Sequence, residues 1–349
     1  MQSQHHPAPG TAKILPSSSA QPSSGTPAPG PFVAEPMAAM HAARAPLQRR
    51  LTALVGGLLA AGLLAGPVLA ADPPPKSGLA AVLDAAPAAD WRKPDPDNVL
   101  YMELPTGRVV IELAPFFAPN HVVNIRKLVR EGYFDGLSIL RSQENYVVQW
   151  GDPEEKNPRP IKTAQQNLKG EFSVPVKKNF PFTRLPDLDT YAPQTGFVQG
   201  FPAGYDPKSG QAWMTHCPGI VGVGRDNSSD SGDGSALYTV IGHAPRHLDR
   251  NITLVGRVID GMPLLSTVKR GNGTLGFFTA PEDYVPIRQI RLASDVPEKE
   301  RVNLELLKTD SPSFKLAVAA LRNRKNDWFK VQAGHVEVCN IPVMARPAK

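Results

Sequence analysis

Residues 139–152 read Ile-Leu-Arg-Ser-Gln-Glu-Asn-Tyr-Val-Val-Gln-Trp-Gly-Asp, and this stretch bears most directly on both the fold and the chemistry of the chain. A single arginine, Arg141, interrupts an apolar run, and Gln149 follows eight positions later. Because side chains of a strand point alternately to its two faces, Arg141 would project from one face of a β-strand. A charged group there must be paired or must line a cleft. The alternative is a surface arginine at the rim of a β-barrel.

The segments around this stretch predict a mainly β domain over residues 98–295. Two runs rich in β-branched residues, separated by Pro-Thr-Gly, predict a β-hairpin over 99–113, and Pro119 opens a helical apolar stripe that Gly132 closes. Further strands are expected at 219–223, 237–241, 253–259 and 287–292, with a short helix at 262–268. This order does not alternate strand and helix, and it suits a closed antiparallel barrel with helices plugging its ends.

Residues 296–349 form a separate C-terminal α/β extension in this interpretation. Phe314, Val318, Leu321 and Trp328 share one face of a helix that Ser311-Pro312 would start, and residues 336–341 are expected to add a strand. The apolar face of the helix indicates that the extension packs on the barrel.

Composition excludes several classes of protein. The chain has 349 residues, 41% of them apolar, 37 prolines, and a net charge of +6 from 38 basic and 32 acidic residues. Residues 1–70 hold four bases and one acid, so the remainder has 34 bases and 31 acids, a net charge of +3 without a basic stripe. A nucleic-acid partner is therefore not indicated. Two cysteines are too few for a disulfide-dense miniprotein or a four-cysteine zinc module.

The first seventy residues indicate export. An almost unbroken apolar run over 51–70 follows Arg44, Arg49 and Arg50 and ends at small residues, which predicts a signal peptide at 40–70 and a periplasmic or secreted protein. After cleavage no stable membrane insertion is expected. The alternative is a single membrane anchor, because the run approaches the ~20 residues that span a bilayer.

Two further segments have a composition typical of irregular structure. Residues 1–39 carry eight prolines and are interpreted as disordered or as a mis-assigned start, with Met37 or Met40 as the true first residue. Residues 71–97 are expected to form a linker. Within the barrel, residues 153–218 form a long, proline-studded and weakly patterned insert.

Three patterns typical of cofactor or metal binding are incomplete in this sequence. Gly222-Val-Gly224 is half of a dinucleotide fingerprint without its third glycine or its helix, and the aspartates at 226, 230 and 233 lack the spacing of a calcium loop. His243 and His247 have a proline between them and no third ligand nearby. No cofactor and no metal are therefore expected.

The stretch 139–152 resembles the signature of the cyclophilin-type peptidyl-prolyl isomerases. Arg141 falls on the catalytic Arg of that family, Tyr146 and Val147 on its Phe-Met pair, and Gln149 on its Gln. Other family blocks resemble, in order, segments between residues 99 and 292; these segments are 107–115, 119–128, 132–136, 218–224, 235–239, 247–249 and 255–262.

The resemblance implies a closed antiparallel eight-stranded barrel with two capping helices, and isomerisation of X–Pro bonds in unfolded or flexible polypeptides. It makes Arg141 the catalytic group, which stabilises the twisted amide, and gives Gln149 the role of holding the guanidinium or the peptide backbone. It places the following residues at the peptide: Tyr146, Val147, Gly224, Arg225, Leu237, Tyr238, His247 and Leu248.

This chain departs from the family pattern in the apolar wall of the pocket. His247 stands where the family has Trp, Leu237-Tyr238 replaces Phe-Phe, and Arg225 occupies the pocket Asn position. Ala236 replaces a Gln and Ile252 replaces a His. These departures favour an alternative, a non-catalytic peptide-binding or chaperone module that uses the same groove.

The two cysteines, Cys217 and Cys339, lie before a predicted barrel strand and in the C-terminal extension. In an oxidising compartment an isolated pair often forms a disulfide, which would fasten the extension to the barrel. The alternative is two buried thiols.

Overall fold

The computed structural model describes residues 78–154 and 156–348. The N-terminal segment 1–39, the predicted signal peptide at 40–70 and the start of the predicted linker lie outside the described residues. The larger of three sheets contains the following strands: β2 (Val99–Leu104), β3 (Gly107–Leu113), β4 (Ser138–Ser142), β5 (Val147–Gly151), β11 (Ile220–Val223), β12 (Leu237–Val240), β13 (Leu254–Asp260), β14 (Val285–Pro286) and β15 (Gln289–Leu292).

The large sheet is antiparallel, with the order β14-β4-β5-β12-β11-β13-β3-β2-β15. The predicted hairpin is its β2–β3 pair, in which Leu104 lies opposite Gly107. The expected closed barrel of eight strands is not what the structure shows. The sheet has nine strands, and within the described residues its outermost strands, β14 and β15, are not paired with each other. It is a curled, open sheet because the ladder of hydrogen bonds ends at both edges.

Two helices lie against this sheet. In α2 (Pro119–Arg130) a proline occupies the first turn, where its missing N–H costs no helical hydrogen bond, and the helix packs against β15. The short α3 (Met262–Ser266) packs against β3. Ile125 and Leu128 of α2 join one buried cluster with Ile139, Trp150 and other residues of the inner sheet face. The predicted capping of two barrel ends by helices stays a prediction.

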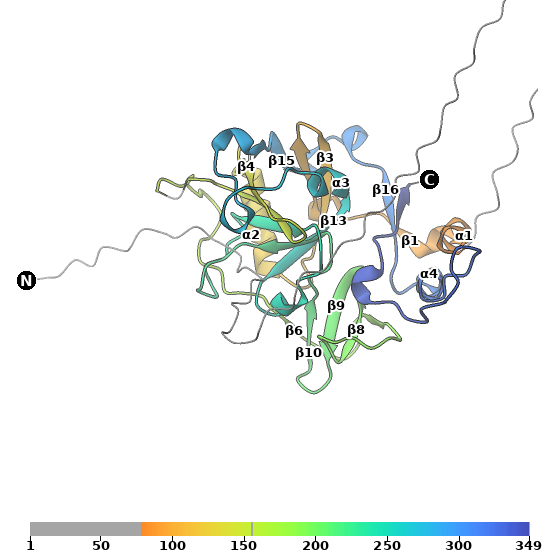
Figure 1. Cartoon of the computed structure of the whole chain (residues 1–349). Helices are drawn as coiled ribbons and strands as arrows, with labels where there is room; N and C mark the ends of the chain where they lie inside the picture. The colour runs from red at the N-terminus through yellow and green to blue at the C-terminus, as the bar shows by residue number, and fades with distance from the viewer. Residues whose placement is uncertain (1–77, 155, 349) are drawn as a thin grey trace, which may run out of the picture. The chain divides into compact units, whose positions relative to one another are not determined.

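The insert at 153–218 has more regular structure than its sequence pattern suggested. It forms a five-stranded antiparallel sheet from β6 (Val174–Pro175), β7 (Phe182–Arg184), β8 (Gln194–Val198), β9 (Phe201–Asp206) and β10 (Gln211–Met214), in the order β6-β10-β9-β8-β7. Strands β8, β9 and β10 run beside one another in Figure 1. The strands are short, and two of them, β6 and β9, contain a proline, which is why periodicity alone does not detect them.

A third sheet joins the two ends of the described chain. Strand β1 (Trp91–Arg92) pairs with β16 (Leu304–Leu307), which pairs with β17 (Ala345–Pro347). Helix α1 (Leu79–Ala85) lies beside α4 (Pro312–Arg322), as Figure 1 shows. The described part of residues 71–97 is therefore not a linker. It folds with the C-terminal extension.

The C-terminal extension differs from its prediction in two places. Helix α4 begins as expected, with the Ser311 side chain accepting from the Phe314 N–H, but it ends at Arg322. Trp328 is therefore outside the helix and 78% exposed. Residues 336–341 contain a 3₁₀ turn instead of a strand, because the strand that pairs with β16 lies later, at 345–347.

Short 3₁₀ helices connect these elements. They are η1 (Ala88–Asp90), η2 (Pro96–Asn98), η3 (Arg246–Leu248), η4 (Thr274–Gly276), η5 (Pro281–Asp283), η6 (Ala293–Asp295), η7 (Glu298–Glu300) and η8 (Val338–Asn340). A disulfide joins Cys339 in η8 to Cys217, three residues before β11, with 4.8 Å between their Cα atoms. Among the described residues, none of the helices has the length and apolar character needed to cross a bilayer.

Candidate active site

A row of three side chains crosses one face of the large sheet. Arg141 of β4 lies opposite Gln149 of β5, and Gln149 lies opposite Tyr238 of β12. Directly opposed residues of antiparallel strands project to the same face, so these three side chains are neighbours. We call them the Arg141 row.

A β-bulge decides which face Arg141 occupies. The register of β4 against β5 shifts between Ile139, which lies opposite Trp150, and Arg141, which lies opposite Gln149. In a regular strand Arg141 would share the face of Ile139, which is the interior packed around Trp150. The extra residue, Leu140, turns Arg141 to the other face, as bulges beside active sites commonly do.

Three neutral acceptors hold the Arg141 guanidinium. Its Nε donates to the Leu275 carbonyl at 2.7 Å, one Nη donates to Gln149 Oε1 at 3.1 Å, and the other Nη donates to Gln143 Oε1 at 2.5 Å. Among the described residues, no carboxylate forms an ion pair with Arg141. These bonds engage three of the five N–H donors that an arginine carries.

The guanidinium is a buried, uncompensated positive charge. Arg141 is 0% exposed, and this burial lowers its pKa to about 10. The side chain remains charged at neutral pH because that value is still well above neutrality. Two aromatic rings flank it, with the guanidinium carbon 5.7 Å from the Tyr146 ring centre and 5.3 Å from that of Phe277.

Apolar side chains extend the same face beyond the row. Val147 lies opposite Val240, and each is two residues from a member of the row on its own strand, so both share the face of Gln149 and Tyr238. Tyr146, Val147, Tyr238 and Leu248 are all buried and belong to one apolar cluster. Three of the residues expected at the peptide, Tyr146, Val147 and Tyr238, therefore adjoin Arg141 or Gln149, and Leu248 belongs to the same cluster.

The structure does not place Leu237 at the peptide, where it was predicted. It lies opposite Trp150 and belongs to the interior cluster on the other side of the sheet. Adjacent residues of a strand face opposite sides, so Leu237 and Tyr238 are not both on the face of Arg141. Leu237 is a core residue, and Tyr238 alone represents that pair on the outer face.

Three further predicted residues lie at the periphery. Gly224 is buried just after β11, and its N–H donates to the Ala236 carbonyl at 2.8 Å. Arg225 donates to the carbonyls of Asn251 and Asp226, at 3.0 and 2.6 Å. His247 is exposed in η3. Arg225 reaches the Arg141 row through its charge, which opposes the rise in the pKa of Tyr238 that burial causes.

Sequence reasoning missed the partner of Tyr238. Its hydroxyl lies 2.9 Å from His216 Nε2, and the Nδ1 of that histidine lies 2.9 Å from Asp249 Oδ1. One signal was available, because a tyrosine at a pocket position where phenylalanine is usual brings a hydroxyl that requires a partner when buried. Nothing in the spacing pointed to His216, which lies 22 residues away in the chain.

A cavity of about 500 Å³ opens beside the row. Gln149 is the member of the row that lines it, together with Ala236, Phe277 and side chains from the start of the insert such as Arg159. The cavity therefore reaches the acceptor that binds Arg141. Among the described residues there is no group of three His, Cys, Asp or Glu side chains arranged to hold a metal ion.

Comparison with known proteins identifies the family. Residues 99–292, more than half of the chain, match the model of the cyclophilin type peptidyl-prolyl cis-trans isomerase family. This chain belongs to the cyclophilins. The matched range contains the Arg141 row and both strands of the predicted hairpin. Such a cyclophilin is an enzyme, a peptidyl-prolyl cis-trans isomerase.

Individual relatives agree with this assignment. A probable peptidyl-prolyl cis-trans isomerase of Brucella suis is 28% identical over 178 residues, which cover 51% of this cyclophilin and 74% of the relative. A cyclophilin from Hirschia baltica is similar in structure, with a TM-score of 0.59 and 28% identity. That likeness covers 74% of this chain and 94% of the other, so it extends beyond residues 99–292.

Proposed function

We propose that this cyclophilin isomerises X–Pro bonds of exported, unfolded or flexible polypeptides, with Arg141 as the catalytic group. The observation that carries this proposal is the Arg141 row, in which a charged guanidinium with neutral partners adjoins an apolar wall. Such a wall suits a proline ring, and such a cation suits the amide beside it.

The reaction requires stabilisation of a twisted amide, and no covalent bond is made or broken. Rotation about the C–N bond meets a barrier of ~18–20 kcal/mol because resonance stiffens that bond. In the twisted state the nitrogen regains its lone pair and becomes a hydrogen-bond acceptor. A donor that binds this state more strongly than the planar ground state lowers the barrier. Arg141 is such a donor, and each tenfold acceleration requires ~1.4 kcal/mol of selective stabilisation.

Because the partners of Arg141 are neutral, they do not reduce the positive electrostatic potential that the guanidinium exerts on a bound peptide. Leu275, Gln149 and Gln143 orient the guanidinium through oxygen atoms that carry no net charge. A carboxylate in the same place would cancel much of the positive potential at the amide. Preorganised donors in a site shielded from water are worth more than the same donors in solvent.

Access to Arg141 requires movement of the chain that covers it. The guanidinium has no exposed surface, and the chain around Leu275 and Phe277 covers it. The peptide would enter through the cavity beside Gln149, which Phe277 also lines. Displacement of Phe277 would then open the path from Gln149 to the guanidinium. Tyr146, Val147, Tyr238 and Leu248 are buried and do not line the cavity, so a proline ring would reach this wall only when the wall is uncovered as well.

The assignment to exported clients rests on the composition of residues 40–70, which predicts a signal peptide. The disulfide between Cys217 and Cys339 suits an oxidising compartment. N-terminal sequencing of the protein recovered from the periplasm or medium would test this part. A first residue near Ala71 supports export and cleavage, whereas full-length protein in the cytoplasm contradicts it.

The catalytic assignment is tested by measuring kcat/KM for cis–trans exchange in a proline-containing peptide. Arg141→Ala should lower it by about tenfold or more, the effect of removing roughly 1.4 kcal/mol of selective stabilisation. Arg141→Lys retains the charge without the planar guanidinium, and its kcat/KM should lie between those of Arg141→Ala and the wild type. Arg130→Ala is the matched control, since Arg130 is a surface arginine paired with Asp295. Wild-type activity in folded Arg141→Ala would remove the assignment.

A further inference from the structure

The hydroxyl of Tyr238 is held by a buried histidine, His216. Tyr238 is 0% exposed, and its Oη lies 2.9 Å from His216 Nε2, with the two rings nearly parallel at an interplanar angle of 7°. Beneath the hydroxyl lies Gly222, where an added Cβ would come within 2.3 Å of Tyr238 Oη. The tyrosine ring therefore fits only because position 222 has no side chain and because His216 receives the hydroxyl.

The acid partner of His216 sets the direction of this hydrogen bond. Asp249 Oδ1 accepts from the His216 backbone N–H and lies 2.9 Å from its Nδ1. A carboxylate only accepts, so Nδ1 carries the proton and Nε2 presents a lone pair. Tyr238 is then the donor and His216 the acceptor. Burial lowers the pKa of His216 more than Asp249 raises it, and burial raises the pKa of Tyr238 well above its usual 10.0, so both groups stay neutral.

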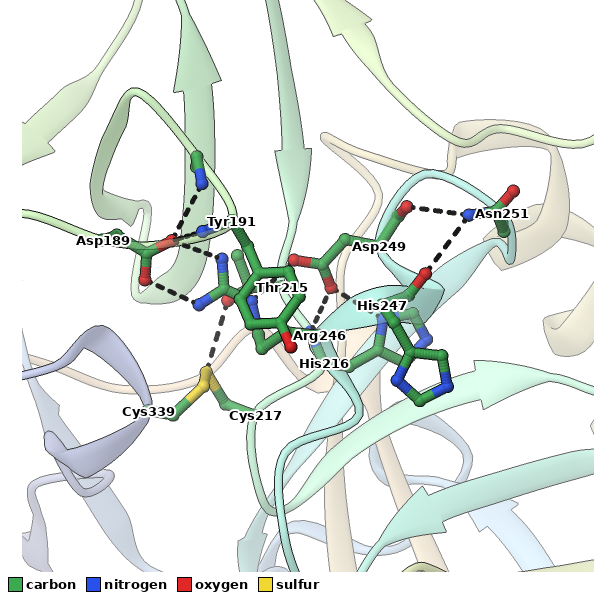
Figure 2. A network of polar contacts seen from close by, with 11 residues as sticks. Asp189, Tyr191, Thr215, His216, Cys217, Arg246, His247, Asp249, Asn251 and Cys339 are labelled. Carbon is green, nitrogen blue, oxygen red and sulfur yellow. Dashed lines mark hydrogen bonds and ion pairs between the residues drawn. A yellow bond between two sulfur atoms is a disulfide. The ribbon is translucent and has the colours of Figure 1, made fainter. Parts of the chain in front are cut away.

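Asp249 is in turn bound to the insert. Arg246 Nε donates to Asp249 Oδ2 at 2.6 Å, and its two Nη atoms donate to the carboxylate of Asp189 at 2.9 and 3.0 Å. Asp189 lies in the insert between β7 and β8, and it also accepts from the backbone N–H groups of Tyr191 and Ala192. Figure 2 shows this connection running from Asp189 through Arg246 to Asp249 and His216.

The connection is buried and its charges alternate. The side chains of Asp189, Arg246 and Asp249 are each no more than 7% exposed. Burial opposes the charge of Arg246, but the hydrogen bonds and charges of the two aspartates outweigh it and raise its pKa. Removal of one member leaves a buried charge or donor unpaired. Each side chain in the connection therefore constrains the position of the next.

We propose that His216 is a positioning residue for the proline pocket, and that the insert acts on this pocket through Asp189, Arg246, Asp249 and His216. His216 orients Tyr238, which forms part of the wall that receives the proline ring in the function proposed above. Because the hydroxyl donates to His216, the ring offers the peptide only its apolar surface. The expected consequence is an effect on substrate binding and therefore on KM, with a smaller effect on kcat, in contrast to Arg141.

A double-mutant cycle tests this role. His216→Asn keeps a donor near the position of Nδ1 for Asp249 but is too short to reach Tyr238. Tyr238→Phe removes the hydroxyl and keeps the ring. His216→Asn should raise KM for a proline-containing peptide by about tenfold, because the ring of Tyr238 is no longer fixed in the wall, and should change kcat by less than about threefold. Tyr238→Phe should raise KM less than His216→Asn does, because it removes the donor together with its need for an acceptor and leaves the ring in the wall.

The decisive measurement is the double variant His216→Asn/Tyr238→Phe. Without a hydroxyl to orient, its KM should return to within about threefold of that of Tyr238→Phe. General damage to the fold would not be repaired by removing an oxygen atom, so this rescue separates positioning from structure. An equal increase of KM in both backgrounds, or no increase in either, would overturn the role of His216.

Arg141→Ala measured in the same series separates this inference from the proposed function. Loss of kcat in Arg141→Ala without coupling between positions 216 and 238 would retain the catalytic assignment and reject the positioning role. Coupling in KM with unchanged kcat in Arg141→Ala would retain the positioning role and reject the catalytic assignment. Thermal denaturation of each variant verifies that it is folded.

Discussion

The two ends of the Arg141 row are held in opposite ways. At one end, uncharged oxygens of Gln143, Gln149 and Leu275 hold Arg141. At the other end, Tyr238 is held by His216 and, behind it, by the alternating charges of Asp249, Arg246 and Asp189. Both ends are buried, so they do not differ in exposure to solvent. They differ in whether the groups that hold them are charged.

The difference matches the role proposed for each end. A group that acts on a substrate through its charge keeps that charge only if its own partners are neutral. A group that serves as a wall needs a fixed position, and fully paired buried charges supply it because breaking any pair is costly. The pKa values follow the same division, since burial lowers that of Arg141 to about 10 whereas the two aspartates raise that of Arg246.

The largest expected effect comes from breaking the charged end. Asp189→Asn removes the negative charge that faces Arg246 at two nitrogens, in a pair whose side chains are 7% and 6% exposed. We expect the free energy of unfolding to fall by about 2–3 kcal/mol, because a buried guanidinium loses half of its compensation. Urea denaturation measures this change.

The surface pair Lys269–Asp283 provides the matched control, since the Lys269 side chain is 72% exposed. Asp283→Asn should change the free energy of unfolding by less than about 0.5 kcal/mol. Equal losses in the two variants would show that burial does not distinguish the charged end from an ordinary surface pair.

A smaller effect is expected when the neutral end is made to resemble the charged one. Gln143→Glu places a carboxylate at 2.5 Å from an Nη of Arg141 without changing the shape of the side chain. The new ion pair should reduce kcat/KM for proline isomerisation by about tenfold, because it cancels part of the potential at the amide.

Gln143→Met tests the same position without a charge. It removes the acceptor and should lower kcat/KM by no more than about threefold, since Gln149 and Leu275 still orient the guanidinium. If Gln143→Glu were as active as the wild type, neutral compensation of Arg141 would have no bearing on catalysis.

The smallest expected effect is a pH dependence of stability at the charged end. Burial lowers the pKa of His216 below its ordinary 6.5, so the folded protein keeps it neutral. As pH falls below 6.5 the unfolded chain binds this proton first, and stability is lost toward the lower pKa of the folded state. Between about pH 7.5 and about pH 5.5 the stability that His216 contributes should therefore decrease.

The comparison of wild type with His216→Asn isolates this contribution, because the other titrating groups are common to both proteins. The fall in stability with decreasing pH should be shallower in the variant. Parallel pH profiles for the two proteins would show that His216 is not kept neutral by the fold.

Elements with a strong local pattern could be predicted from the sequence. The β2–β3 hairpin and helix α2 were expected from residues close together in the chain, and they appear at the expected places. The pairing of Arg141 with Gln149 was also accessible, because these residues are eight positions apart on the two arms of one short hairpin.

Errors arose where a local rule met a nonlocal constraint. Strand alternation alone could have excluded Leu237 from the face of Tyr238. The bulge at Leu140 was not accessible in this way, since it depends on the register that β5 imposes on β4. The five strands of the insert are stabilised by one another, and each is too short to carry much signal individually.

The sequence alone determined the pairing of Arg141 with Gln149, on which the proposed catalysis rests, because residue type and short-range spacing suffice for these two residues. Tertiary structure decided how Tyr238 is held. Its partner His216 is 22 residues away, Asp249 is 33 residues from His216, and Asp189 is 57 residues from Arg246. Contacts at such separations depend on loop closure and on packing of the whole chain, which no local pattern of side chains encodes.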